Sequence, residues 1–476
     1  MSYEKRADYS ERYLFPPSLE DWLSADHPAR FIREFVDMLD LGELGFRMRV
    51  ADEGRPNYAA DLLLKVWLYG YLMRIRSSRM LERACRENIA LVWLTGMNEP
   101  DHNTLWRFFK ENKKALRNVF RQVVRVAAKA ELIGLVLHAV DGTKIAALAS
   151  RRSAWHKADL EKALLKLDQS IEETIRRVEA AESEERGGEY RLPEELCEKK
   201  QLREKIQSAL AEMETAGTKD YHPKEKDARM MKCGGGRKEF GYNCQAVADS
   251  ESGLIIAADV VNKADDHGLL VPMIEEVEAG LGKAADETVA DNGYHSAEEL
   301  LRAEDHEYGV LVNLGRQREE VPGAGDYHPS KFRYDESRDC CICPRGEVLT
   351  FEREAKSHNK YPVKIYRCHS YKECPVRWQC SKAKNGRKIE LSIYYASLVR
   401  QRDKQRQAEK QAALKRRQVI IEPVFGHIKQ AMGFRRWTVS GLGAVRTQWS
   451  LLCTTVNLSK LHKFWISGQL VLGNPS

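Results

Sequence analysis

The feature that most constrains the fold is a pair of apolar segments that each run directly into an aspartate. GLVLHAVDGTKIAAL, residues 134–148, reads as a buried strand that ends at Asp141. ADETVADNGYHS, residues 285–296, reads as a short strand that ends at Asp291, with a helix starting near Ser296. A tight turn is the simplest explanation of one Asp-Gly pair. Two such aspartates at the ends of central strands predict carboxylates that meet at one edge of a sheet.

Carboxylates that meet disfavour each other's ionisation unless a cation lies between them. Mg²⁺ takes oxygen ligands, and two ions about 4 Å apart activate a water and stabilise the leaving oxygen of a phosphodiester. Glu422, in the apolar helical stretch RRQVIIEPVFGHIKQAMGFRRW, is the candidate third carboxylate, because a buried unpaired charge is expensive. The alternative is a salt bridge between Glu422 and a neighbouring basic residue such as Lys429.

The rest of the chain predicts several folding units, since 476 residues exceed one small core. Residues 25–131 have a helical pattern. Residues 156–216 repeat leucine and isoleucine at spacings of three and four amid charges of both signs, which predicts a solvated helical hairpin. KEFGYNCQAVADSESGLIIAADVVN predicts an antiparallel strand pair, followed by a helix over 266–281 and a strand at YGVLVNL. The predicted class is mixed α/β.

Charge and hydropathy indicate the partner and the compartment. Residues 400–437 contain eleven Lys or Arg against three acids, an excess of +8 where the whole chain carries +7. Such a basic patch suggests a polyanion. The chain lacks an apolar run of about 18 residues, and MSYEKRADYSERYLF lacks the apolar core of a signal peptide. We therefore expect a cytoplasmic protein without a membrane partner.

Eleven cysteines in such a chain argue against a disulfide scaffold. Six of them lie between Asp291 and Glu422, in DCCICPRG and YRCHSYKECPVRWQC. A structural Zn²⁺ site and reduced, buried thiols are both open explanations. The candidate zinc ligands are Cys343, Cys368, Cys374 and Cys380.

The motifs together resemble a known family. VDGTKIAALAS, VADNGYHS and IEPVFGHIKQAMGFRRW look like the three catalytic blocks of insertion-sequence DDE transposases. PDHNTLWRFF resembles the end of that family's helical N-terminal domain, and ARMMKCGGGRKEFGYNCQAVAD a segment between its first two acids. The chain departs from the family pattern at Gln418, where an arginine is common, and at Ser440, where Arg-Gly-Leu is frequent.

The resemblance implies an RNase H-like catalytic domain in which Asp141, Asp291 and Glu422 hold two Mg²⁺ ions, with Mn²⁺ as a substitute. It implies hydrolysis at the transposon ends and then attack of the freed 3′-hydroxyl on target DNA. We expect a helical DNA-binding domain at residues 1–132 and a catalytic domain in three pieces, at 133–155, 217–335 and 390–465. A charged helical hairpin is expected at 156–216, and a cysteine-rich insertion at 336–389.

The charge and spacing of basic residues on the predicted helices, together with the resemblance, predict the DNA contacts. The N-terminal helices are expected to bind the terminal inverted repeats in double-stranded DNA, with Arg107 and Lys110 as contacts. A homodimer is expected to pair the two transposon ends, and the DNA-bound protein is expected to be associated with the nucleoid. Lys429, Arg435 and Arg436 are expected to meet DNA phosphates. The alternative function is a catalytically decayed transposase that only binds DNA.

Overall fold

The computed structural model describes residues 18–47, 57–149, 153–182, 194–314, 325–356 and 362–472. Its N-terminal part is helical, as the periodicity predicts. The side chain of Asp101 caps α5 by accepting the backbone N–H of Thr104 at 2.8 Å. The elements here are η1 (Leu19–Trp22), α1 (Pro28–Asp37), α2 (Ala60–Leu72), α3 (Ser78–Glu87), α4 (Ile89–Leu94), α5 (His102–Glu111) and α6 (Lys113–Lys129).

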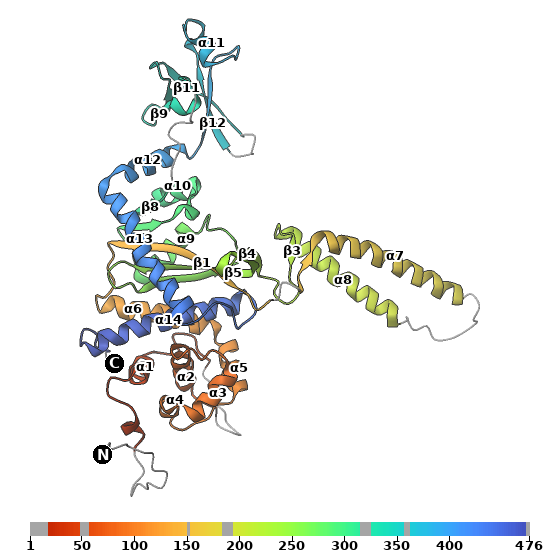
Figure 1. Ribbon diagram of the computed structural model, residues 1–476, viewed down its shortest axis with the longest axis vertical. Coiled ribbons are helices and arrows are strands. Elements are labelled where there is room, and N and C mark those ends of the chain that lie inside the picture. The colour runs from red at the N-terminus through yellow and green to blue at the C-terminus, as the bar shows by residue number, and fades with distance from the viewer. Residues whose placement is uncertain are drawn as a thin grey trace, which may run out of the picture.

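A mixed sheet forms the centre of the molecule (Figure 1). Its strands are β1 (Leu137–Ala146), β4 (Arg229–Lys232), β5 (Lys238–Asp249), β6 (Ile255–Val261), β7 (Glu287–Ala290) and β8 (Val310–Val312). Strand β1 is antiparallel to β5 and parallel to β7, β7 is parallel to β8, and both β4 and β6 pair with β5. The mixed α/β class and the β5–β6 hairpin are therefore confirmed.

One strand prediction is wrong, because β1 does not end at Asp141 but continues to Ala146. Its pairing with β7 stops at Ala139, whereas its pairing with the long strand β5 continues through Asp141 to Ala146. The neighbouring strand β5, which is distant in sequence, holds this part of β1 extended. The Asp-Gly pair is therefore not a turn.

The helices that follow the strands are α9 (Leu270–Leu281), η4 (Asn292–Tyr294), α10 (Ala297–Asp305), α12 (Tyr395–Arg406), α13 (Ala408–Gly426), a π turn (His427–Ala431) and α14 (Leu442–Ile466). Helix α9 begins four residues later than predicted, and α10 is capped by Ser296 as predicted. Helix α13 packs across β1, β5 and β7.

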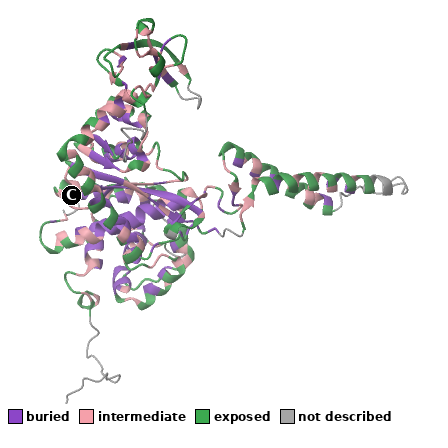
Figure 2. Ribbon diagram, turned by 45° about the horizontal axis from the view of Figure 1, so that its top comes forward, coloured by how far each residue is buried: buried purple, intermediate pink, exposed green. Residues whose placement is uncertain are grey.

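Helix α14 joins the two halves of the molecule. It packs against β6 on one side and against α1, α2 and α6 on the other. Most of its side chains are buried, and Figure 2 shows the buried residues continuing from the sheet into the N-terminal helices. The N-terminal helices and the sheet thus share one hydrophobic core, which we call the body.

Two modules project from the body (Figure 1). The arm consists of β2 (Trp155–His156), α7 (Lys157–Glu182), α8 (Glu194–Thr215) and β3 (Asp220–Tyr221), with a small core of its own. Two helices, α7 and α8, lie in the range predicted as a helical hairpin, and the predicted break at 185–193 lies outside the described residues. The segments η3 (Gly234–Gly236) and β4 then lead back into the sheet.

The second module is the cysteine sheet, an antiparallel sheet that also has its own small core. Its elements are η5 (Pro329–Lys331), β9 (Arg333–Asp335), β10 (Cys340–Ile342), β11 (Val348–Lys356), β12 (Pro362–Cys368), η6 (Ser370–Lys372), α11 (Arg377–Cys380) and β13 (Lys388–Ser392). No helix in the described part of the chain has the length and apolarity needed to cross a membrane.

Candidate active site

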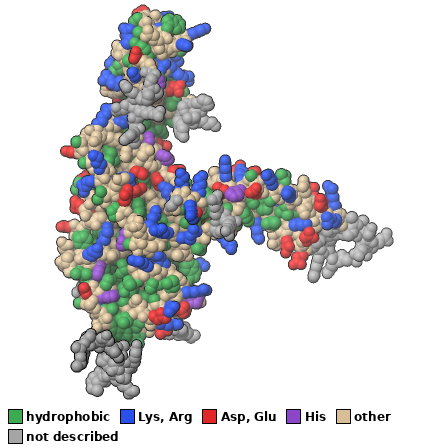
Figure 3. All heavy atoms as spheres, in the orientation of Figure 1, with side chains coloured by type: hydrophobic (Ala, Val, Ile, Leu, Met, Phe, Trp, Pro, Cys, Tyr) green, Lys and Arg blue, Asp and Glu red, His purple; other side chains and the backbone are tan. Residues whose placement is uncertain are grey.

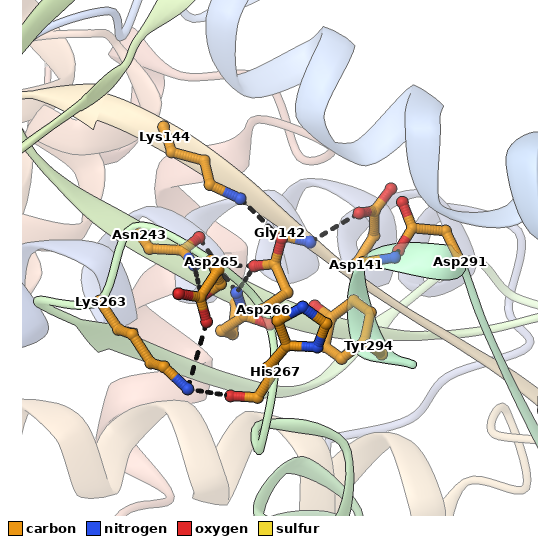
Figure 4. A network of polar contacts seen from close by, with 12 residues as sticks. Asp141, Gly142, Lys144, Asn243, Lys263, Asp265, Asp266, His267, Asp291 and Tyr294 are labelled. Carbon is orange, nitrogen blue, oxygen red and sulfur yellow. Dashed lines mark hydrogen bonds and ion pairs between the residues drawn. The ribbon is translucent and has the colours of Figure 1, made fainter. Parts of the chain in front are cut away.

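The fold brings Asp141 and Asp291 together. Asp141 lies on β1, two residues beyond the point where β1 and β7 stop pairing at Ala139 and Val289. Asp291 follows β7 directly, and its carboxylate accepts the backbone N–H of Gly293 at 2.8 Å. Because β1 and β7 are parallel neighbours, the two carboxylates lie at the same place on the sheet (Figure 4).

Asp141 is largely buried and carries two hydrogen bonds. One carboxylate oxygen faces a guanidinium nitrogen of Arg417 at 2.7 Å, and the other accepts the backbone N–H of Gly142 at 2.7 Å. Burial raises the pKa of Asp141 and the nearby Asp291 raises it further, while Arg417 opposes both effects. The positive charge of Arg417 thus partly compensates for the burial of Asp141 and for the negative charge of Asp291 beside it.

Glu422 lies on α13, and its side chain is exposed. The next residue, Pro423, stands inside the helix, and the π turn begins five residues after Glu422. Proline removes a helix hydrogen bond, and π turns often occur at functional sites. Among the described residues, no ion pair joins Glu422 to Lys429 or to any other base.

The basic residues of the final block differ in their surroundings. Lys429 is half-buried on the Asp141 face, where burial lowers its pKa and the nearby Cys244, Cys233 and Asp141 oppose that shift. Arg435 is exposed, and its Nε donates to the carbonyl of Lys429 at 3.3 Å. Arg436 is already paired with Glu239 at 2.7 Å. Figure 3 shows Lys and Arg side chains gathered over α13 and beside the base of the arm.

A second polar network lies against the two aspartates (Figure 4). Its centre is Asp266, between β6 and α9, whose carboxylate accepts the side-chain amides of Asn243 at 2.7 Å and Gln245 at 2.9 Å and pairs with Lys144 at 2.7 Å. The buried Tyr294 hydroxyl donates to the side-chain carbonyl of Gln245.

Sequence reasoning missed this network and Arg417. The signal available was a polar residue at alternate positions, 243 and 245, of an otherwise apolar strand. The arginine that contacts Asp141 is Arg417, one position before Gln418.

The remaining predicted site residues lie elsewhere. Arg107 and Lys110 are exposed on α5, beside Trp106. All eleven cysteines are free thiols. Cys343, Cys368 and Cys380 pack against the core of the cysteine sheet, and burial together with the neighbouring Cys343 and Cys374 raises the pKa of Cys368.

The Cys343 segment forms a tight turn. The backbone N–H of Arg345 donates to the sulfur of Cys343 at 3.4 Å, and Gly346 has a φ of +90°. Across the described ranges, however, no three His, Cys, Asp or Glu side chains are arranged so that they could hold one metal ion. This applies to the four thiols and to the three predicted carboxylates alike.

Comparisons with known proteins match the two ends of the chain. A family model described as a transposase DDE domain matches residues 342–462, which include Glu422. A model described as a transposase domain, DUF772, matches residues 17–111, which include α1 to α5. No curated protein and no solved structure matches. Both matches are to transposase models, and together they support an insertion-sequence DDE transposase family.

Proposed function

We propose that this transposase binds the terminal inverted repeats of its element, cleaves strands at the element's ends and transfers them into target DNA. The observation that carries the proposal is the meeting of Asp141 and Asp291, two carboxylates from adjacent parallel strands, in a largely buried place. Such a pair is costly without a cation, and hard divalent cations take carboxylate oxygens.

The strand order supports an RNase H-like catalytic domain, which a DDE domain implies. Strand β1 is central. On one side lie β5, antiparallel to β1, and β6, antiparallel to β5; on the other side lie β7 and β8, both parallel to β1. Helix α13 then crosses β1, β5 and β7 and carries Glu422 over the same sheet.

In this proposal Asp141, Asp291 and Glu422 hold two Mg²⁺ or Mn²⁺ ions, which supply an activated water and charge stabilisation at the leaving oxygen. Arg417 keeps Asp141 paired in the metal-free chain, which explains how a largely buried carboxylate is tolerated beside a second one. Glu422, exposed on α13 beside Pro423, is the proposed third ligand.

The DNA contacts are proposed on charge and exposure. Arg107 and Lys110 are exposed on a helix whose N-terminus is capped, and we assign them to the terminal repeats. Lys429 and Arg435 are assigned to phosphates near the scissile bond, with Arg436 further along the backbone. A homodimer would pair the two ends of the element.

The cysteine sheet is proposed to hold a structural Zn²⁺ through Cys343, Cys368, Cys374 and Cys380. The donor chemistry supports this, because three of these thiols share one small core and a backbone N–H already points at the Cys343 sulfur. Reduced thiols without metal are the alternative.

The catalytic proposal is tested with the full chain and labelled DNA that carries the element's ends. Asp141→Asn, Asp291→Asn and Glu422→Gln should each abolish cleavage while end binding persists, and EDTA should abolish wild-type cleavage. Asp286→Asn, which changes an exposed aspartate before β7, is the matched control and should cleave normally.

Cleavage by the triple variant, or cleavage in excess EDTA, would overturn the catalytic proposal. If the wild-type chain binds the ends but never cleaves them, the chain is the decayed, DNA-binding form instead.

A further inference from the structure

The carboxylate of Asp266 is largely buried and has several hydrogen-bond donors, although Asp266 lies in a loop. Its carboxylate receives the amides of Asn243 and Gln245, both from β5 and both fully buried, and the ammonium group of Lys144 from β1. Only 14% of its side chain is exposed. The neighbouring Asp265 is exposed instead, and its side chain pairs with Lys263 at 3.2 Å at the surface.

Two glycines make room for the Asp266 carboxylate. A Cβ atom at Gly142, next to Asp141, would lie 2.6 Å from one Asp266 oxygen. A Cβ atom at Gly293 would lie 3.3 Å from the other Asp266 oxygen and 2.9 Å from an oxygen of Asp291. The Asp266 carboxylate therefore occupies the space that a side chain at Gly142 would need and lies close to that of a side chain at Gly293, and Figure 4 shows Asp266 beside Gly142 and Asp141.

Strand alternation separates the role of Asp266 from that of Asp141. Successive side chains of a strand point to opposite faces, so Lys144, which pairs with Asp266, is on the other face of β1 from Asp141. Asp266 lies on the Lys144 face, and Arg417 of α13 lies on the Asp141 face. Asp266 therefore lies on the opposite side of the β1 backbone from Asp141.

We infer that Asp266 is a positioning residue that sets the relative placement of Asp141 and Asp291 for metal binding. The inference rests on the proposed function. The carboxylate links β1 through Lys144 and β5 through Asn243 and Gln245, and it lies 3.3 Å from the place that a Cβ atom would take at Gly293, in the turn after β7. Tyr294, three residues after Asp291, also joins this network, because its hydroxyl donates to the side-chain carbonyl of Gln245.

The chemistry of the donors makes the carboxylate necessary. Two amide groups and an ammonium group all present hydrogens to Asp266, and an asparagine at position 266 would set its own NH₂ against one of them. Buried donors without an acceptor are costly, so the strands would shift to find new partners. The two aspartates, attached to the same segments, would shift with them.

The test is a titration of the metal-free full-length chain with Mn²⁺, followed by electron paramagnetic resonance and without DNA. Asp266→Asn should weaken Mn²⁺ binding about 10- to 100-fold, the usual effect of removing support from metal ligands. Asp265→Asn, one residue away, should bind as the wild type does. The melting temperature of each metal-free variant shows whether the body is intact.

Gly293→Ala is the second variant, because it crowds Asp266 and Asp291 while leaving every hydrogen-bonding group of the network in place. It should weaken Mn²⁺ binding in the same direction. Mn²⁺ affinity unchanged in both Asp266→Asn and Gly293→Ala would overturn the inference. So would a loss of Mn²⁺ binding seen only in variants that also lose their folded structure.

Asp141→Asn separates this inference from the proposed function. If Asp141→Asn binds Mn²⁺ as the wild type does, the metal site itself is wrong. If Asp141→Asn abolishes binding and Asp266→Asn leaves it unchanged, only the positioning role fails.

Discussion

The body and the two projecting modules are stabilised in different ways. One hydrophobic core runs from α1 through α14 and the central sheet, so the helices at the N-terminus and the last helix of the chain depend on each other. The arm and the cysteine sheet each have a small separate core. The arm joins the body through the short β2–β3 pair, whose ladder has two residue pairs.

This difference indicates which parts can be changed independently. The N-terminal helices share their core with α14, so a fragment of residues 1–131 would leave a large apolar face uncovered. DNA binding by these helices must therefore be measured in the full chain. The arm, by contrast, buries Leu160 in a core of its own, against which Leu164, Leu167 and Leu210 pack.

The same leucine-to-alanine change should destabilise the body strongly at a buried position and the arm very little at an exposed one. Leu452→Ala, at a fully buried position of α14, should lower the free energy of unfolding by about 2–5 kcal/mol. Leu165→Ala, at a position of α7 that is 66% exposed, should change it by less than about 0.5 kcal/mol. Urea unfolding followed by circular dichroism measures both. Equal losses would contradict the difference in burial between the two positions.

The next effect concerns the cysteine sheet. Chain purified without chelators should contain one Zn²⁺, measured by a colorimetric chelator after denaturation, and Cys343→Ser or Cys380→Ser should remove it. Cys85→Ser, in the body, is the control and should keep the metal. If the purified wild-type chain contains no Zn²⁺, the zinc proposal is wrong and the four cysteines are reduced thiols without metal.

A smaller effect distinguishes two basic residues of the body. Lys429→Ala should weaken binding to all DNA sequences alike and reduce the slope of log affinity against log salt by about 0.9, the share of one phosphate contact. Arg436→Ala should reduce the slope less, because Arg436 is already paired with Glu239. An unchanged slope for Lys429→Ala, with a lower melting temperature, would show that Lys429 acts in folding.

The smallest expected effect comes from removing the arm. Replacing residues 157–218 with a short Gly-Ser linker should change the body's free energy of unfolding by less than about 1 kcal/mol, because the arm core is separate. The measurement is again urea unfolding, with the Leu452→Ala chain as the destabilised reference. A loss as large as that of Leu452→Ala would show that the arm supports the sheet.

Local patterns were enough to predict most of the elements. Helical periodicity located the N-terminal helices and the arm, and Ser296 marked the start of α10. The end of β1 was predicted wrongly, because the pairing that extends β1 past Asp141 comes from β5, about a hundred residues away. Local sequence carries no signal for such a partner.

The site was predictable only in part, for the same reason. Asp141 and Asp291 each follow an apolar run, so their meeting could be inferred. Arg417 and Asp266 reach these residues through tertiary contacts alone, across 276 residues in the case of Arg417 and Asp141. Nothing in the local sequence KADDH distinguishes Asp266 from Asp265.

Binding of a catalytic metal ion by Asp291 is tested by changing which metal the side chain prefers. In Asp291→Cys a thiolate replaces the carboxylate, and Mn²⁺ accepts the softer sulfur more readily than Mg²⁺ does. Asp291→Cys should lose end cleavage in Mg²⁺ and recover part of it in Mn²⁺, and Asp286→Cys should show no such switch. Cleavage by Asp291→Cys at the wild-type rate in Mg²⁺, or at equal rates in the two metals, would contradict metal binding by Asp291.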